Sequence, residues 1–206
     1  ISSHAIAPAV VLRGEGAWAE ALSKISALCS RPLLLGRSQA TSSLRAGLAS
    51  DLLQSGLMPQ QAELRYDCCE EDLERLASEA ADCDAVLATG GGKVLDAGKL
   101  LAHRLELPCI TVPLSAATCA GWTALSNLYS MYGAFQGDVA LARCPDLLVF
   151  DHGLVRQAPA RTLASGIADA LAKWYEASVS SGNSSDGLVQ QAVQMARVLR
   201  DQLLID

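Results

Sequence analysis

Short apolar runs alternate along the chain with longer segments in which apolar residues recur at helical spacing. A short apolar run is typical of a buried strand, and the helical spacing is typical of a helix packed on a sheet. The pattern predicts strands at 9–12, 32–35, 61–66, 84–89, 108–112 and 147–150. Between the first five strands it predicts helices at 17–28, 41–53, 71–80 and 94–105. This alternation predicts an α/β fold with a mostly parallel, Rossmann-like sheet and helices on both faces.

The strand–helix alternation stops after the fifth predicted strand. A loop rich in small polar residues follows it and leads into a predicted hairpin formed by residues 125–130 and 135–141. The last quarter of the chain has a helical pattern, which predicts helices at 160–180 and 188–204. The linker between these two helices is rich in serine and also contains glycine and asparagine, as is typical of a loop.

Two domains follow from this change of pattern. We expect an α/β domain over residues 1–157 and the beginning of an all-helical domain over residues 158–206. The chain begins with Ile1 rather than Met and stops inside a helical pattern. We therefore interpret it as part of a longer protein.

The strongest chemical signal lies between the fourth predicted strand and the helix that follows it. Gly90, Gly91 and Gly92 expose backbone N–H groups at the positive end of that helix. Such a turn can seat a phosphate or pyrophosphate. Lys93 and Asp96 lie one helical turn apart beside the glycines and strengthen the signal. A plain glycine-rich tight turn is the alternative.

The glycine segment departs from two common phosphate-binding motifs. A Walker loop requires an earlier glycine and a Ser or Thr after the lysine, but Val94 follows Lys93. The common dinucleotide fingerprint requires a third glycine where this chain has Leu95. The segment therefore predicts a phosphate-bearing ligand without assigning either motif.

Composition narrows the class of protein. The formal net charge of −6 argues against a nucleic-acid partner, and the absence of a long apolar run argues against a membrane span. The seven cysteines include no Cys-x-x-Cys pair, which favours reduced thiols in a cytoplasmic protein. Cys119 differs from the others because it lies in a polar, turn-like segment.

Five ordered segments resemble the dehydroquinate synthase-like, iron-containing alcohol dehydrogenase superfamily, and within it the glycerol dehydrogenases. The likeness runs from about residue 1 to 180 and is strongest over 84–176. Five segments in the same order are far more specific than the glycines alone. They are 90–96, 110–113 with the Ala117-Thr118 loop, 124–129, 145–151, and 158–161 with the helix 166–174.

The resemblance implies a dehydroquinate synthase-like fold, with a dinucleotide-binding domain, a helical domain and an active site in the cleft between them. It implies hydride transfer between an alcohol or polyol and NAD or NADP, assisted by one divalent metal, zinc or iron, in a homo-oligomer. The residues that it implies as cofactor contacts are Gly90, Gly91, Gly92, Lys93, Asp96, Thr118, Thr123, Leu125 and Tyr129.

Asp169 matches the metal-ligating aspartate of the family, and a carboxylate suits zinc or iron. The alternative is an exposed i, i+4 pair with Lys173. The family completes its metal site with two histidines further along the chain, and here no histidine follows Asp169. We expect His103 and His152 to be surface residues. Truncation is the simplest explanation, and loss of the metal is the other.

Two further positions bear on specificity. Cys119 stands where glycerol dehydrogenases have an aspartate near the substrate hydroxyls, which puts glycerol in doubt, although Cys119 could also be a small buried filler. Gly36, followed by Arg37 and Ser38, stands where NAD-preferring members often place an aspartate against the ribose. Such a sequence would accommodate a 2′-phosphate, while a helix-entry turn capped by serine is the alternative.

The sequence therefore predicts a metal-dependent alcohol or polyol dehydrogenase of glycerol-dehydrogenase type. A glycerol-phosphate dehydrogenase or a dehydroquinate synthase would share the fold. The second of these needs a basic cluster for its substrate, which the sequence does not show. A catalytically inactive dinucleotide-binding protein is the alternative from another class.

Overall fold

The computed structural model describes residues 4–205. The chain forms two compact units. The first unit comprises Ile1–Ser115 and Cys119–Ala158, and the second comprises Ala116–Thr118 and Pro159–Asp206. Within the described part of the chain, no helix is long and apolar enough to cross a membrane.

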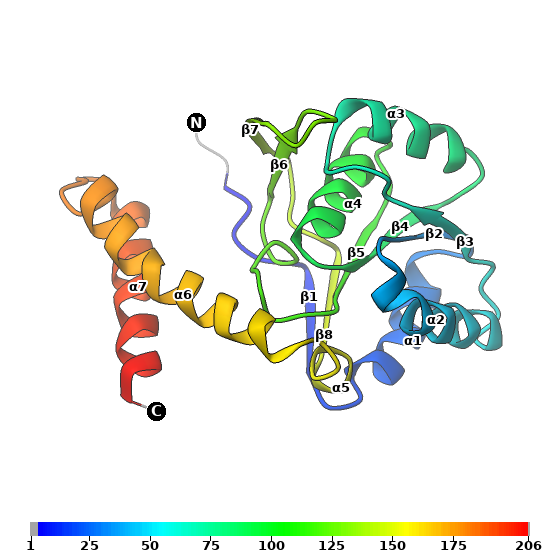
Figure 1. Ribbon diagram of the computed structural model, residues 1–206, viewed down its shortest axis with the longest axis horizontal. Coiled ribbons are helices and arrows are strands. Elements are labelled where there is room, and N and C mark those ends of the chain that lie inside the picture. The colour runs from blue at the N-terminus through cyan, green and yellow to red at the C-terminus, as the bar shows by residue number, and fades with distance from the viewer. Residues whose placement is uncertain (1–3, 206) are drawn as a thin grey trace. The chain divides into compact units, whose positions relative to one another are not determined.

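The first unit is built on a six-stranded sheet in which every neighbouring pair of strands is parallel (Figure 1). The strand order is β1-β8-β5-β4-β2-β3. The interior strands β2, β4 and β5 are buried along their whole length, as their unbroken apolar runs predict. The strands are β1 (Val10–Gly14), β2 (Pro32–Gly36), β3 (Gln60–Glu63), β4 (Ala85–Gly90), β5 (Cys109–Pro113) and β8 (Leu147–Asp151).

Helices cover both faces of this sheet, which confirms the predicted α/β architecture (Figure 1). Helices α1 (Ala17–Leu28) and α2 (Ser42–Gln54) pack on one face, and α3 (Glu70–Glu79) and α4 (Gly92–Arg104) pack on the other. Alternate residues of β2 divide between the two cores, because side chains of a strand point to opposite faces.

The strand order creates a topological switch point between β2 and β4. These strands are neighbours, but β2 leads into α2 on one face and β4 leads into α4 on the other. In open α/β sheets, ligands bind outside the carboxyl ends of the strands at such a point. Here those ends are Gly36 and Gly90.

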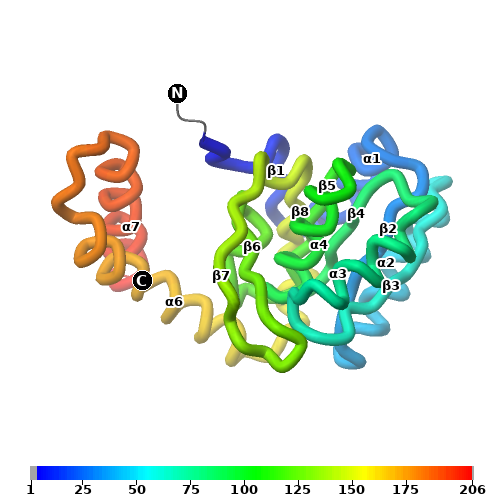
Figure 2. Tube along the Cα trace, turned by 90° about the horizontal axis from the view of Figure 1, so that it is seen from above, coloured from blue at the N-terminus to red at the C-terminus, as the bar shows by residue number. Residues whose placement is uncertain are grey.

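A separate antiparallel hairpin lies beside α4 and consists of β6 (Leu125–Tyr129) and β7 (Phe135–Ala140), which run side by side in Figure 2. The hairpin was predicted, but the third strand ends earlier than predicted. The carboxylate of Asp72 accepts hydrogen bonds from the backbone N–H groups of Arg65 and Tyr66 at 2.6 and 3.1 Å. The N–H of Leu64 still donates to the carbonyl of Gly36 at 2.8 Å, so the backbone leaves the sheet after Leu64, where Asp72 accepts from the next two N–H groups.

One short helix and a 3-10 turn were not predicted. Helix α5 (His152–Val155) begins at Asp151, whose carboxylate accepts hydrogen bonds from the N–H groups of Gly153 and Leu154. This is ordinary N-capping by an aspartate. The 3-10 turn η1 (Gln39–Thr41) precedes α2, so the helix starts at Ser42.

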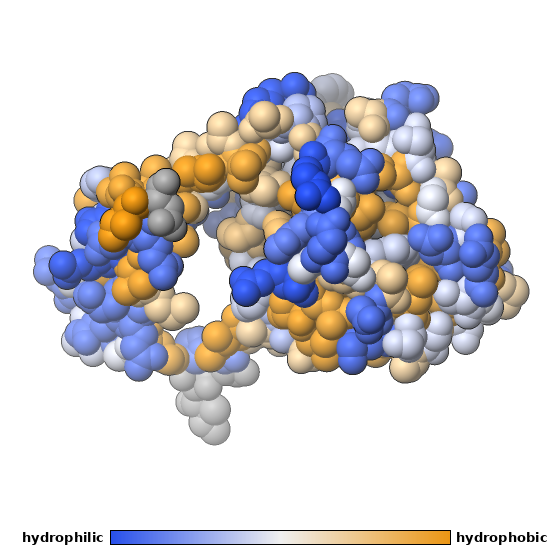
Figure 3. All heavy atoms as spheres, turned by 90° about the horizontal axis from the view of Figure 1, so that it is seen from below, coloured by the Kyte–Doolittle hydropathy of each residue, from blue (hydrophilic) through white to orange (hydrophobic). Residues whose placement is uncertain are grey.

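The second unit is a pair of helices, α6 (Ala160–Ser181) and α7 (Gly187–Ile205). Gly166 lies against the backbone carbonyl of Ala116, where a Cβ would not fit. Many large apolar side chains of this unit remain exposed, and Figure 3 shows them among the hydrophilic residues. They include Leu163, Tyr175, Val179, Met195, Val198 and Ile205.

Candidate functional site

The glycine turn lies at the switch point. Gly90 ends β4 and Gly92 begins α4, so Gly91 alone separates strand from helix. The carbonyl of Gly90 accepts a hydrogen bond from the N–H of Leu114 at 3.0 Å, which fixes the inner side of the turn. A Cβ at Gly91 would meet no atom within 4 Å, so the outer side is open.

The helix that follows this turn presents donors to the open side. The first N–H groups of any α-helix have no partner inside the helix, and here they belong to Gly92 and Lys93. The positive end of the helix dipole lies at the same place. The turn can therefore hold an anionic group such as a phosphate by its backbone alone.

Close packing holds α4 in place on the sheet. A Cβ at Gly98 would collide with the Cβ of Ala88 on β4, so the glycine allows the helix to approach the strand. Residues 94–102 of the helix are all buried. Packing of residues 94–102 therefore fixes where α4 begins at the carboxyl end of β4.

A group of charged side chains lies beside the glycine turn. Asp67 accepts from Lys93 at 2.7 Å and from Arg37 at 2.8 Å. Burial raises the pKa of the Asp67 carboxyl, but the hydrogen bonds and charges of Lys93 and Arg37 outweigh burial and hold that pKa below its usual range. Asp67 is therefore a carboxylate that fixes two cations near the turn.

Gly36 is covered by a buried arginine. A Cβ at Gly36 would collide with the side chain of Arg45, which is only 6% exposed. The guanidinium of Arg45 donates to the carbonyls of Arg37 and Ser38, at 2.9 Å each, and to Glu63. The last residue of β2 is therefore a glycine under a guanidinium, and that guanidinium is paired with Glu63, the register partner of Gly36 on β3.

Asp96 points into the protein rather than towards the turn. It is 9% exposed and its carboxylate lies 3.2 Å from the ammonium of Lys99. Burial raises the pKa of Asp96, and the charge of Lys99 opposes that rise. The carboxylate also accepts from the backbone N–H of Asn127. A cofactor contact of Asp96 stays a prediction.

The remaining predicted contacts are divided between the two units. Thr123, Leu125 and Tyr129 lie in the first unit, at the start of the hairpin and along β6. Leu125 is exposed, and the ring of Tyr129 packs edge-on against another hairpin ring. Thr118 belongs to the second unit. Cys119 is exposed, so the interpretation of this residue as a buried filler is wrong.

Asp169 is exposed on α6 and lies 3.3 Å from the ammonium of Lys173. This is the surface pair that the sequence offers as an alternative to a metal ligand. In the part of the chain that the structure describes, no group of three His, Cys, Asp or Glu side chains could hold a metal ion. These residues alone therefore do not fit a complete metal site. His103 and His152 are exposed, as predicted.

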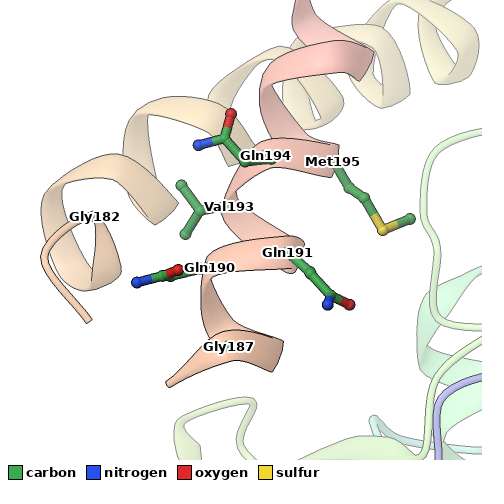
Figure 4. A pocket seen from close by; sticks show the side chains of 7 residues that line it. All are labelled: Gly182, Gly187, Gln190, Gln191, Val193, Gln194 and Met195. Atoms are coloured by element: carbon green, nitrogen blue, oxygen red, sulfur yellow. The ribbon is translucent and has the colours of Figure 1, made fainter. Parts of the chain in front are cut away.

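A hollow of about 690 Å³ lies at the turn between α6 and α7 (Figure 4). Gly182 and Gly187 are among the residues that line it, and the lining side chains come from one stretch of α7. They are Gln190, Gln191, Val193, Gln194 and Met195. None of these is charged, so the hollow has no feature that would select a phosphate.

The sequence profile of the iron-containing alcohol dehydrogenases matches residues 8–152, which span the glycine turn and the whole sheet. The chain belongs to that family. The match confirms the resemblance drawn from the five segments, and the structural comparison below confirms the fold.

Two sequence relatives and one solved structure illustrate the similarity. An uncharacterized oxidoreductase of Synechocystis is 50% identical over 98% of this chain and 52% of its own length. A glycerol dehydrogenase of Escherichia coli is 33% identical over 86% of this chain and 50% of its own length. The crystal structure of a probable glycerol dehydrogenase from Sinorhizobium meliloti aligns with a TM-score of 0.86 at 26% identity, covering 100% of this chain and 58% of that one. The chain thus spans about half the length of the curated relatives it matches.

Three residues near the turn were missed by sequence reasoning: Arg45, Asp67 and Lys99. Arg45 and Asp67 meet their partners across loops and neighbouring strands, which no local pattern reveals. Lys99 did leave a signal, because Lys99 and Asp96, three residues apart, are the two charged residues in the otherwise apolar stretch 94–102. A charged residue in such a position is seldom buried unless it is paired.

Proposed function

We propose that the full-length protein is an oxidoreductase that transfers a hydride between an alcohol or polyol and NAD or NADP. Membership of the iron-containing alcohol dehydrogenases supports this proposal, as do relatives named glycerol dehydrogenase. The observation that carries it is the open glycine turn at the switch point between β2 and β4.

The residues around the turn suit the pyrophosphate of a dinucleotide. The N–H groups of Gly92 and Lys93 would bind its oxygens, and the ammonium of Lys93 would add a positive charge at the edge. When bound, the nicotinamide ring supplies the hydride chemistry. The task of this chain is to hold and orient the cofactor, and the close packing of α4 on β4 would set its position.

The surroundings of Gly36 favour tolerance of NADP. Gly36 itself carries no carboxylate, and the guanidinium of Arg45 that lies over it is paired with Glu63 of β3. A 2′-phosphate beside Gly36 would therefore meet an ion pair rather than an unpaired carboxylate. We therefore propose that the protein accepts NADP as well as NAD.

Two further residues are proposed to act in the whole protein. Asp169 is proposed as one ligand of a divalent metal, zinc or iron. Cys119 is proposed to face the substrate, and its exposure is compatible with that role. A thiol is a poorer hydrogen-bond partner for a polyol than a carboxylate, so a less hydroxylated alcohol than glycerol suits it better.

Reduction of NAD and NADP by the full-length protein would test the proposal, with a panel of alcohols, polyols and glycerol phosphate. The informative variant is Gly91→Val, because Gly91 has φ −89° and open space around it, so valine fits the backbone but covers the turn. We expect the KM for the cofactor to rise at least about tenfold, since the lost phosphate contacts are charge-assisted.

The matched control is Gly47→Val on α2, where a Cβ also meets no atom within 4 Å. This variant should leave the KM for the cofactor unchanged. An unchanged KM in Gly91→Val would contradict the proposed site. Binding of NADH without oxidation of any alcohol would indicate a dinucleotide-binding protein without catalysis, and turnover of glycerol phosphate alone would indicate the related phosphate-using enzyme.

A further inference from the structure

Lys99 is a lysine buried in the core of the first unit. It is 2% exposed and lies on α4, two turns after the glycine turn. A buried ammonium loses its hydration, which is tolerated only when hydrogen bonds and a counter-charge replace the water. Every contact that satisfies Lys99 is therefore costly to remove.

The ammonium of Lys99 joins α4 to the segment that begins the hairpin. It donates to the carbonyl of Thr123 at 3.2 Å, to Thr123 Oγ1 at 3.1 Å and to the carbonyl of Leu125. Asp96 supplies the counter-charge at 3.2 Å from the same helix. The three protons of an ammonium are thus fully engaged.

The segment held by Lys99 is also attached by neutral hydrogen bonds and by apolar packing. Thr123 and Ala124 precede β6, and β6 pairs only with β7 in a hairpin separate from the main sheet. The carbonyl of Ala124 accepts from the N–H of Leu141 at 2.9 Å, the N–H of Asn127 donates to the Asp96 carboxylate, and Ser126 Oγ donates to the carbonyl of Asp96 at 3.0 Å. Lys99 is thus a charged tie between residues 123–125 and the glycine-turn helix, whereas the donors of these neighbouring bonds are neutral.

We propose that Lys99 is a positioning residue that fixes residues 123–125 against the glycine-turn helix and thereby sets the affinity for the part of the dinucleotide beyond its pyrophosphate. This inference rests on the proposed function. Gly36, on the β2 side of β4, is the proposed neighbour of the adenosine ribose. The loop that follows β5 leads to residues 123–125, and β5 lies on the other side of β4. The nicotinamide half would therefore extend towards the segment that Lys99 holds.

The test compares the dissociation constants of ADP and NADH for the unchanged protein and for Lys99→Met. ADP contains the adenosine and the pyrophosphate but not the nicotinamide half. We expect the dissociation constant of NADH to rise about 10- to 100-fold, as for loss of a charge-assisted bond, while that of ADP changes less than about twofold. Equal weakening of both ligands, or of neither, would overturn the proposal.

A second variant and a second measurement distinguish a loss of positioning from a general loss of folding. Lys99→Gln keeps a shorter neutral donor and should give an intermediate rise for NADH, whereas Lys24→Met removes an exposed lysine of α1 and should change nothing. Amide hydrogen exchange should speed up at 123–129 in Lys99→Met but not along β4. Uniformly faster exchange would show that Lys99 stabilises the whole unit rather than residues 123–125, and would overturn its positioning role.

The two hypotheses fail in different ways. If the unchanged protein binds neither ADP nor NADH, the proposed function is wrong, and the link between Lys99 and cofactor affinity falls with it. If the unchanged protein binds both ligands and Lys99→Met weakens them in parallel, the proposed function stands and the positioning role is wrong.

Discussion

The ammonium of Lys93 lies 2.7 Å from Asp67 Oδ1, which joins the first turn of α4 to the loop after β3. Arg37 binds the same carboxylate at 2.8 Å. Because these two cations lower the pKa of Asp67, the folded state binds a proton at this carboxyl less readily than the unfolded chain. The group of three charges is thus a pH-dependent source of stability.

Asp67→Asn should lower the free energy of unfolding at pH 7 by about 1 kcal/mol, because both cations keep only a neutral partner. The contribution of a carboxyl with a depressed pKa is present above its unfolded pKa and is lost as the pH falls through its folded pKa. The difference between parent and variant should therefore shrink below about pH 4. Urea unfolding from pH 7 to 3 measures it.

The control for this series is Asp82→Asn, since Asp82 is 78% exposed and lies 3.8 Å from Arg31. That variant should change stability little at any pH. A difference between Asp67→Asn and the parent that stays constant down to pH 3 would mean that the carboxylate contributes nothing through its charge.

Gly98→Ala should destabilise the first unit by about 1–3 kcal/mol, even though alanine favours helices, because the new Cβ would collide with Ala88. Ala88→Gly in the same chain should recover most of that loss by removing the opposing methyl group. Gly47→Ala, at an open position of α2, should instead stabilise by about 0.5–1 kcal/mol. Additive effects of the two substitutions at the contact would rule out the close approach of α4 to β4.

Cofactor preference should shift when an acidic group is placed at the end of β2. Gly36→Asp needs room, so it is best combined with Arg45→Ala, which removes the side chain that a Cβ would meet. Repulsion between the new carboxylate and a 2′-phosphate should cost about 1–3 kcal/mol, which shifts the ratio of NADP to NAD affinity about 5- to 150-fold towards NAD.

Arg45→Ala alone is the control for this double variant, because it separates the loss of the guanidinium from the gain of the carboxylate. An identical ratio of NADP to NAD affinity in the double variant and in this control would show that Gly36 does not face the ribose.

Metal content tests the proposed role of Asp169. In the full-length protein, Asp169→Asn should lower bound zinc or iron well below one ion per chain, because a neutral amide is a weaker ligand for these ions. Glu176→Gln is the matched control, since Glu176 pairs with the same Lys173 at 2.9 Å. Full metal occupancy in Asp169→Asn would leave Asp169 as one half of a surface ion pair.

The sequence predicted the bounds of the fully buried strands closely, and it predicted the bounds of the partly buried strand β3 less accurately. Strands β2, β4 and β5 are buried on both faces, so each appears as a continuous apolar run. Strand β3 lies at the sheet edge with one buried residue, and its end depends on Asp72 rather than on its own pattern. The order of the strands has no local signature, so it had to come from the structure.

At the candidate site, too, local features were predicted from the sequence and contacts between separate elements were not. The glycine turn was predicted because its chemistry is local, a strand end followed at once by a helix start. The fixing of Lys93 by Asp67 and the covering of Gly36 by Arg45 depend on packing between separate elements. Sequence spacing therefore indicated the phosphate seat but not the charges that surround it.

The most direct test of the central claim is a crystal structure of the protein with NADH or NADPH bound. The account predicts pyrophosphate oxygens within hydrogen-bonding distance of the backbone N–H groups of Gly92 and Lys93, with the adenosine ribose beside Gly36. A dinucleotide bound elsewhere on the chain, with the space over Gly91 left free, would contradict it.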